Sequence, residues 1–203
     1  ELLRPIPFVK AFSSDRERAI ETARRIIAGH QPQPALIKLS ALREYYFGVL
    51  EGDPGNAVMT RTIRRYGLTA SWRAWVGSQR FAGLIRSIRN ADPTHQAEDL
   101  PDLLARVRQA FAQIDAQSPD NRDILVVSHG LLLSALIYQL APEQLPLGLL
   151  KNTSVTRVDV TDKGMRLRGV NLIRESDILA LRHDEPQKDD HQNEPQSIDQ
   201  GKE

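Results

Sequence analysis

Short apolar runs alternate with longer amphipathic stretches along this chain, a pattern typical of a layered α/β domain. The run Ile124-Leu125-Val126-Val127 is β-branched at three of its four positions and is too short to form a helix of its own. Such an uninterrupted run predicts a central strand of a parallel sheet, buried on both faces. Other apolar segments predict strands at 8–12, 35–39, 154–160 and 165–170, of which the last two form a hairpin.

Apolar residues at helical spacing predict helices between these strands. The first helix is predicted to have Ser14 as its N-cap, with Glu17 completing a capping box, and to end before Gly29. Further helices are predicted at 100–116 and 131–140, the first of them clearly amphipathic. Strands and helices therefore follow one another through most of the chain.

A basic segment at 53–97 interrupts this alternation, and Pro54 and Gly55 break the chain near its start. We interpret the segment as a helical insertion or lid, whose basic face is either solvated or in contact with an anionic substrate. In the second case the insertion sets the choice of substrate. Its arginines are Arg61, Arg64, Arg65, Arg73, Arg80, Arg86 and Arg89.

Composition predicts one domain followed by a tail. With 203 residues, 40% of them hydrophobic and 26% charged, the chain can bury one substantial core, which we place at 1–182. Residues 183–203 hold seven acidic residues and two lysines, which predicts a disordered tail. Without this tail the 27 basic and 26 acidic residues become 25 and 19, a net charge of +6 that favours an anionic ligand. Nucleic acid is not the expected partner, because no basic run is interleaved with aromatic residues.

The absence of cysteine excludes disulfides and thiolate metal sites and is compatible with a reducing cytoplasm. No apolar stretch approaches the roughly 20 residues that cross a bilayer. We therefore expect a cytoplasmic protein without a membrane partner. The sequence does not define an oligomeric state.

His129 is the leading candidate for chemistry, because it follows the predicted strand 124–127 and precedes a helix. Ligands of open α/β sheets bind at the carboxyl ends of the strands, and the free N–H groups of a following helix favour an anion. Gly130 frees the backbone at this point, and a cationic imidazole would add to the positive field. In the structural alternative, His129 only ends the strand and hydrogen-bonds a loop.

Three segments together resemble the histidine phosphatase superfamily, also called the phosphoglycerate mutase-like family. Residues 13–23 are similar to its S-x-L-x-R-A-x-x-T-A helix start, 42–52 to its L-R-E-x-x-F-G-x-W-E-G segment, and 126–130 to its S-H-G strand end. A weaker fourth match lies at 152–156. The matches are in the family's order, and the resemblance covers roughly residues 5–175. It implies an α/β three-layer sandwich with a mostly parallel central sheet, here lacking the first strand.

The resemblance also implies roles for single residues in phosphomonoester hydrolysis through a phosphohistidine intermediate. His129, with Gly130, is expected to bind and polarise the phosphoryl group, and Arg18 to grip two of its oxygens. Arg16 is the less suitable arginine. Glu44 matches the general acid, whereas Glu51 is expected to be structural. The partner is then a small phosphorylated substrate, and neither a cofactor nor a metal is expected.

The nucleophile of the family lies in an R-H-G motif at the end of the first strand, and these 203 residues contain no R-H-G. We expect that the chain is an amino-terminally truncated piece of an enzyme or a natural relative that lost catalysis. Either way it should be inactive by itself. Loss of a central strand should also leave unpaired backbone groups and a poorly stable fold. The remaining histidines do not replace the nucleophile: His30, His95, His183 and His191.

Other functions remain open at this point. The sequence Glu44-Tyr45-Tyr46-Phe47-Gly48 differs from the E-R-H-Y-G of the glycolytic mutase, which favours a phosphatase over mutase-type phosphoryl transfer. A non-catalytic module that binds phosphorylated ligands would use the same cationic pocket, and the upstream coding sequence would distinguish it from an enzyme. A dinucleotide-binding domain is disfavoured because the chain has no G-x-G-x-x-G turn.

Overall fold

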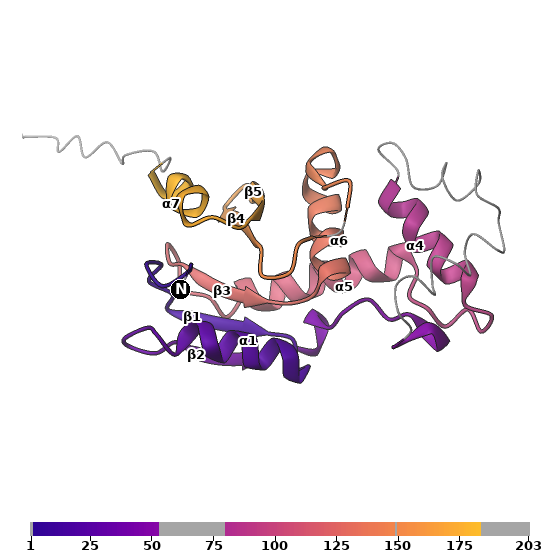
Figure 1. Cartoon of the computed structure of the whole chain (residues 1–203), viewed down its shortest axis with the longest axis horizontal. Helices are drawn as coiled ribbons and strands as arrows, with labels where there is room; N and C mark the ends of the chain where they lie inside the picture. The colour runs from indigo at the N-terminus through magenta and orange to yellow at the C-terminus, as the bar shows by residue number, and fades with distance from the viewer. Residues whose placement is uncertain (1, 53–79, 149, 184–203) are drawn as a thin grey trace, which may run out of the picture.

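A parallel three-stranded sheet forms the centre of the protein, described here from a computed structural model that covers residues 2–52, 80–148 and 150–183. The strands are β1 (Lys10–Ser13), β2 (Ala35–Lys38) and β3 (Ile124–Val127), in the order β2-β1-β3 (Figure 1). In the register of the sheet, Phe12 of β1 lies opposite Ile37 and Val126. The three predicted strands are confirmed, although β1 begins two residues later than the apolar run that predicts it.

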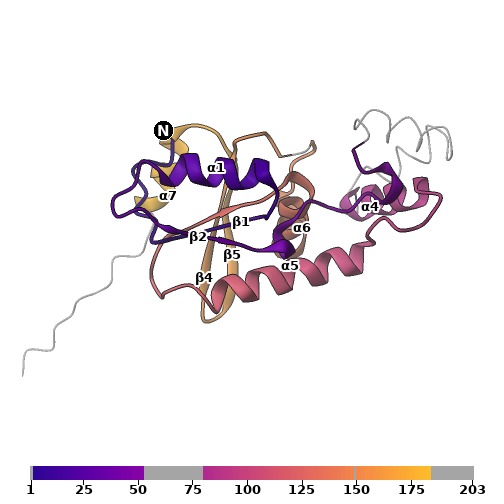
Figure 2. The same ribbon diagram turned by 90° about the horizontal axis from the view of Figure 1, so that it is seen from below.

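Helices cover both faces of this sheet (Figure 2). Helix α1 (Glu17–Ile27) packs on one face, where Ala11 and Leu125 join a small apolar cluster with Ile27. Helices α5 (Leu100–Asp115) and α6 (Gly130–Leu140) lie on the other, where Phe12 joins the main core. Alternate side chains of one strand thus enter different clusters, as the period of a strand requires. The predicted α/β architecture with a parallel central sheet is confirmed.

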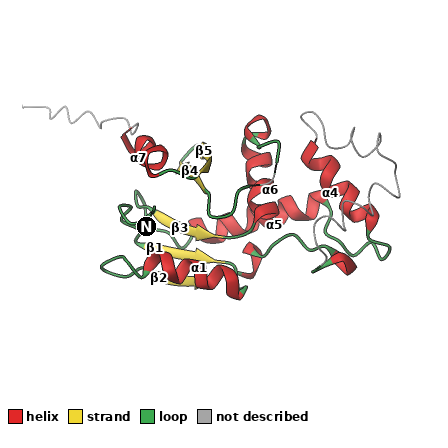
Figure 3. Ribbon diagram, in the orientation of Figure 1, coloured by secondary structure: helices red, strands yellow, loops and turns green. Residues whose placement is uncertain are grey.

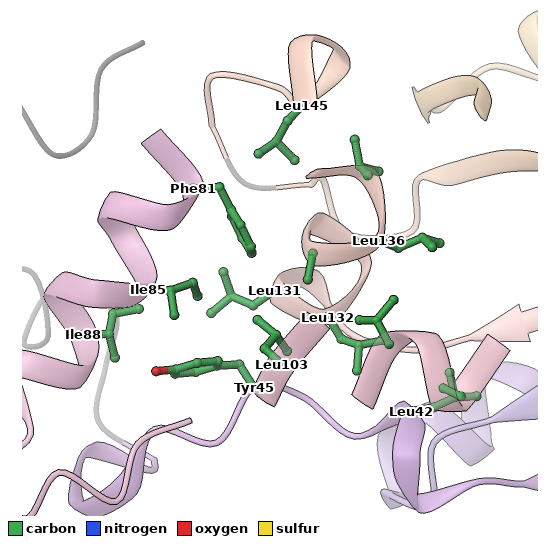
Figure 4. Packing of buried hydrophobic residues seen from close by; sticks show 14 of the residues in the cluster. Leu42, Tyr45, Phe81, Ile85, Ile88, Leu103, Leu131, Leu132, Leu136 and Leu145 are labelled. Carbon is green, nitrogen blue, oxygen red and sulfur yellow. The ribbon is translucent and has the colours of Figure 1, made fainter. Parts of the chain in front are cut away.

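The main core extends beyond the sheet to helix α4 (Arg80–Ala91). Phe81 and Ile85 point from α4 toward Leu131 of α6, and Tyr45 lies in the same cluster (Figure 4). Of the predicted insertion at 53–97, residues 53–79 lie outside the described part of the chain, together with most of its arginines. The described part of that insertion is an amphipathic helix that contributes its apolar face to the core.

The predicted hairpin is confirmed as β4 (Val155–Thr161) and β5 (Gly164–Leu172), which pair antiparallel in a second sheet (Figure 3). Within the described residues, β3 has a strand partner on one side only. Helix α7 (Glu175–His183) follows β5 and was not predicted; it buries Ile178 and packs on β5. The acidic tail from residue 184 onward lies outside the description.

The loop that carries Gly48 contacts the loop that follows α4 and carries Asp92, beside the core. The short helices η1 (Ser40–Leu42) and η2 (Gly48–Leu50) shape the segment after β2, and η3 (Pro142–Gln144) follows α6. Gly48 has φ +64, and a Cβ there would lie 2.0 Å from Asp92 Oδ2. Asp92 is fully buried, and its carboxylate accepts hydrogen bonds from the backbone N–H groups of Thr94 (2.9 Å) and Ala97 (2.8 Å). Burial would raise the pKa of Asp92, but hydrogen bonds from Thr94 and Ala97 lower it to about 2.

No helix of the described residues has both the length and the apolar character to span a bilayer.

Candidate active site

The structure brings His129 and Arg18 into direct contact, although they are 111 residues apart in sequence. His129 is the N-cap residue of α6 at the end of β3, and Arg18 lies in the first turn of α1. Arg18 Nε and Nη2 lie 3.2 and 2.9 Å from His129 Nδ1. On the other side of the ring, His129 Nε2 lies 2.9 Å from Ser14 Oγ. The carboxyl ends of β1 and β3 are adjacent in the sheet, which explains why the three residues meet.

These contacts define the charge state of His129. A guanidinium can only donate hydrogen bonds, so Nδ1 is an acceptor and the ring proton lies on Nε2, which donates to Ser14 Oγ. Burial lowers the pKa of His129 to about 4, with further lowering by the charges of Arg18, Arg16 and Arg106. The imidazole is therefore neutral at pH 7. The expectation of a cationic imidazole at His129 is therefore wrong, and the positive charge beside the start of α6 comes from arginines.

Ser14 is not the N-cap of α1, which corrects the predicted capping box. The helix begins at Glu17, its N-cap is Arg16, and no side chain caps it. The hydroxyl of Ser14 is occupied instead by His129 and by the backbone N–H of Arg16, at 3.2 Å. The next residue, Asp15, is also engaged, because both its carboxylate oxygens accept hydrogen bonds from Arg43, which lowers the pKa of Asp15.

Glu44 caps helix α6 from a distant loop. Its Oε1 accepts hydrogen bonds from the backbone N–H groups of Leu131 (3.1 Å), Leu132 (3.3 Å) and its neighbour Tyr45 (3.0 Å). Burial raises the pKa of Glu44, and these hydrogen bonds and the charge of Arg18 oppose that rise. The carboxyl group of Glu44 thus lies at the N-terminus of α6, beside the first turn that follows His129. Its Oε2 accepts no hydrogen bond from the described residues.

Gly130 contributes the first backbone N–H of α6. Glu44 takes the N–H groups of the next two residues, whereas the N–H of Gly130 has no acceptor within the described part of the chain. A Cβ at this position would meet no atom within 4 Å, so there is open space beside the helix start. One N–H of the helix terminus, rather than the whole terminus, is therefore available to an anion.

Sequence reasoning missed two further residues beside this group, Arg106 of α5 and Glu98. Arg106 Nε and Nη2 donate to the two carboxylate oxygens of Glu98 at 2.8 and 2.6 Å. The guanidinium also contacts the loop that carries Glu44 and contributes to the lowered pKa of His129. The pattern of residues 100–116 places Arg106 on the polar side of an amphipathic helix, but no spacing indicates its partners.

The remaining predicted residues have local roles or are exposed. Arg16 is exposed, and Glu51 accepts a hydrogen bond from the backbone N–H of Phe47 at 3.2 Å, in agreement with a structural role. His30 is buried and contacts backbone carbonyl oxygens, whereas His95 lies in the loop after α4. His183 ends α7, and His191 lies outside the described residues. Among the described side chains, no group of three or more histidines and carboxylates could hold a metal ion.

A comparison with protein families decides where this geometry belongs. The family model of the histidine phosphatase superfamily (branch 1) matches residues 1–173, which include Arg18, Glu44 and His129. The chain belongs to this superfamily. The resemblance inferred from the motifs is confirmed.

Relatives of the chain include both mutases and phosphatases. It is 30% identical over 151 residues to the 2,3-bisphosphoglycerate-dependent phosphoglycerate mutase 2 of Gloeobacter violaceus, covering 71% of this chain and 61% of that protein. It is 33% identical over 140 residues to the adenosylcobalamin/alpha-ribazole phosphatase of Salmonella typhimurium, covering 68% and 59%. The chain therefore spans about three fifths of the length of these curated relatives. The crystal structure of phosphoglycerate mutase from Bacillus anthracis superimposes with a TM-score of 0.77 at 30% identity, covering 89% of this chain and 79% of that one.

Proposed function

We propose that the protein is a phosphomonoester hydrolase that acts on a small phosphorylated substrate through a phosphohistidine intermediate. The contact between Arg18 and His129 is the observation that carries this proposal. A guanidinium has five N–H donors, and contact with His129 Nδ1 uses those on two nitrogens, which leaves others for phosphate oxygens. The N–H of Gly130 offers another donor. Arg18, His129 and Gly130 thus form the phosphate-binding part of the site.

In this mechanism a histidine attacks phosphorus, a P–N bond forms, and the bond to the leaving alkoxide breaks. Water then hydrolyses the P–N bond and frees the histidine and inorganic phosphate. The attacking imidazole of the family belongs to an R-H-G segment, which these 203 residues do not contain. We therefore propose that residues 1–203 alone bind phosphate without turnover.

Glu44 is the proposed general acid, which protonates the alkoxide and later takes a proton from water. The upward shift of its pKa by burial favours the protonated acid, and its free Oε2 leaves one oxygen for a substrate. Glu98 is the second carboxyl of the same hydrogen-bond network. The variants Glu44→Gln and Glu98→Gln distinguish the two in the complete enzyme, because only loss of the general acid, which acts in its protonated form, removes the alkaline arm of the pH–rate profile.

Mutase-type phosphoryl transfer is the second candidate, since two of the relatives described above are phosphoglycerate mutases. The departure of residues 44–48 from E-R-H-Y-G favours the phosphatase. Product analysis separates the two activities, because a phosphatase releases inorganic phosphate and a mutase returns an isomeric phosphate ester. A cytoplasmic location, the acidic tail as a disordered segment and the domain boundary at residue 182 stay predictions.

Calorimetric titration of purified residues 1–203 with inorganic phosphate tests the proposal. Arg18→Ala should weaken phosphate binding roughly 10- to 100-fold, since charge-assisted hydrogen bonds are lost. Arg24→Ala, which removes an exposed charge from the last turn of the same helix, is the matched control and should bind normally. Equal affinity in both variants would contradict the site. Turnover of p-nitrophenyl phosphate by residues 1–203, abolished by His129→Ala, would contradict the proposed lack of activity.

A further inference from the structure

The guanidinium of Arg106 reaches from the middle of α5 to the loop that carries Glu44. Its Nη1 donates to the backbone carbonyls of Ala41 (3.0 Å) and Arg43 (2.7 Å), and its Nη2 donates to that of Glu44 (3.4 Å). Backbone carbonyls in a loop outside regular structure need such partners when they are shielded from water. One side chain thus satisfies most of the carbonyl groups of this turn.

The opposite edge of the same guanidinium is bound by Glu98. Its Nε and Nη2 donate to the two carboxylate oxygens, and the two side chains are only 21% and 12% exposed. Glu98 is fixed by its backbone as well: its N–H donates to Tyr46 O (2.9 Å), and its carbonyl accepts from the hydroxyl of Tyr45 (2.6 Å). Hydrogen bonds at both its backbone groups therefore hold Glu98 in place, and its carboxylate binds the guanidinium of Arg106 from this fixed position.

These contacts use the full donor capacity of Arg106. A guanidinium has five N–H donors in a planar fork, and five acceptor contacts are made: three carbonyl oxygens and two carboxylate oxygens. A lysine has only three donors on one nitrogen and cannot reproduce this geometry. An arginine is thus specifically required at this position.

The position of Glu44 follows from contacts at both of its ends. Its backbone carbonyl is held from α5 by Arg106, while its carboxyl is held at the N-terminus of α6 by Leu131 and Leu132. We infer that Arg106 is a positioning residue, which holds the backbone of Glu44 and the carboxylate of Glu98 in register with the phosphate site beside His129. That the region beside His129 is a phosphate site rests on the proposed function, whereas the contacts made by Arg106 do not depend on it.

Arg106 also belongs to the cations that keep the neighbouring imidazole neutral, because its charge contributes to the lowered pKa of His129. Removal of the charge and removal of the donor geometry are separable effects. Arg106→Lys keeps the charge and loses donors, whereas Arg106→Gln loses both.

Amide hydrogen exchange of residues 1–203 without ligand tests the geometric role. In Arg106→Lys the amides of Leu131 and Leu132 should exchange about tenfold faster, because Glu44 no longer caps them in a fixed position. Amides in the middle of α1, such as that of Ala23, should keep their protection. Arg108→Lys, an exposed arginine on the same helix, is the matched control and should change neither. Unchanged exchange at Leu131 and Leu132, or equal acceleration in α1, would overturn the inference.

A second measurement distinguishes the charge from the geometry. An NMR titration should show a higher pKa for His129 in Arg106→Gln and an unchanged one in Arg106→Lys. If Arg106→Gln does not fold, the exchange data of Arg106→Lys still decide the inference. Neither readout needs phosphate or turnover, so a chain that failed to bind phosphate would refute the proposed function and leave this result standing.

Discussion

The start of α6 and the end of α1 each hold a histidine that is 7% exposed, but the two residues have different partners. His129 contacts two polar side chains, those of Arg18 and Ser14. His30 contacts the backbone carbonyls of Ile6 (2.9 Å) and Ile26 (3.1 Å) and joins the N-terminal segment to the end of α1. Burial is identical at the two positions, so only the side-chain partners distinguish His129, the histidine of the proposed site, from His30.

The surroundings of the two rings differ in the same way. His30 packs beside the ring of Phe8, with centroids 5.4 Å apart, and its neighbours form the apolar cluster under α1. Three arginines act electrostatically on His129, and Glu44 caps the helix that it begins. The contacts of His30 at the end of α1 thus join segments of the fold. Those at the start of α6 instead place arginine charges near the backbone N–H of Gly130, which has no acceptor among the described residues.

The largest expected effect is a pH dependence of stability that originates at His129. Its pKa falls from 6.5 to about 4 in the folded protein, so between these values the unfolded chain binds the proton first. The stabilisation is complete above pH 6.5 and decreases by up to roughly 3 kcal/mol as the pH falls to 4. Urea unfolding at several pH values measures this slope. His129→Gln should flatten this slope, and a slope that persists unchanged in that variant would contradict its origin at His129.

A smaller effect is expected at Glu44, with the opposite sign. Because burial raises the pKa of Glu44, its protonated form stabilises the fold, and this contribution is lost as the pH rises above 4.5 toward the folded value. Glu44→Gln should remove that loss, while Glu44→Ala should cost about 1 kcal/mol because α6 loses its cap. Thermal unfolding across this pH range measures both. Glu51→Gln is the control, and a similar change there would show that the effect is not specific to the helix start.

The smallest expected effect is spectroscopic. A phosphate dianion bound at Arg18 should favour the imidazolium form and raise the pKa of His129. His30, which lies beyond the opposite end of α1 from Arg18, is the internal control. Side-chain NMR spectra recorded with and without inorganic phosphate measure the two shifts separately. Parallel shifts of both histidines would indicate a general effect of the salt and not a bound anion.

Much of the fold could be predicted because its signals are local. The run at 124–127 and the amphipathic pattern at 100–116 depend on neighbouring residues, and both elements are found. The start of α1 could not be predicted, since Ser14 hydrogen-bonds His129, 115 residues away, and not the helix N–H groups. Helix α7 was missed because its sequence, ESDILALRH, has a weak apolar pattern and ends at the acidic tail.

The candidate site likewise includes residues that the sequence motifs predict and residues that only the folded structure reveals. Arg18, Glu44 and His129 could be found because each lies in a motif at the end of a strand, and the sheet brings Arg18 and His129 together. The neutral charge of His129 could not be predicted, because it depends on burial among arginines. The roles of Arg106 and Glu98 depend on contacts between α5 and a loop more than 60 residues earlier, which no spacing records.

The close approach of Gly48 to Asp92 links two stretches of sequence that share no element. Any larger residue at 48 would displace the Asp92 carboxylate, and with it the turn through Thr94 and Ala97 that leads to Glu98. A Cβ at 48 would also lie 2.7 Å from the backbone N of Ala97, so a shorter side chain at 92 would not by itself make room for it. In an alignment of homologues, the acid at column 92 should therefore occur together with glycine at column 48.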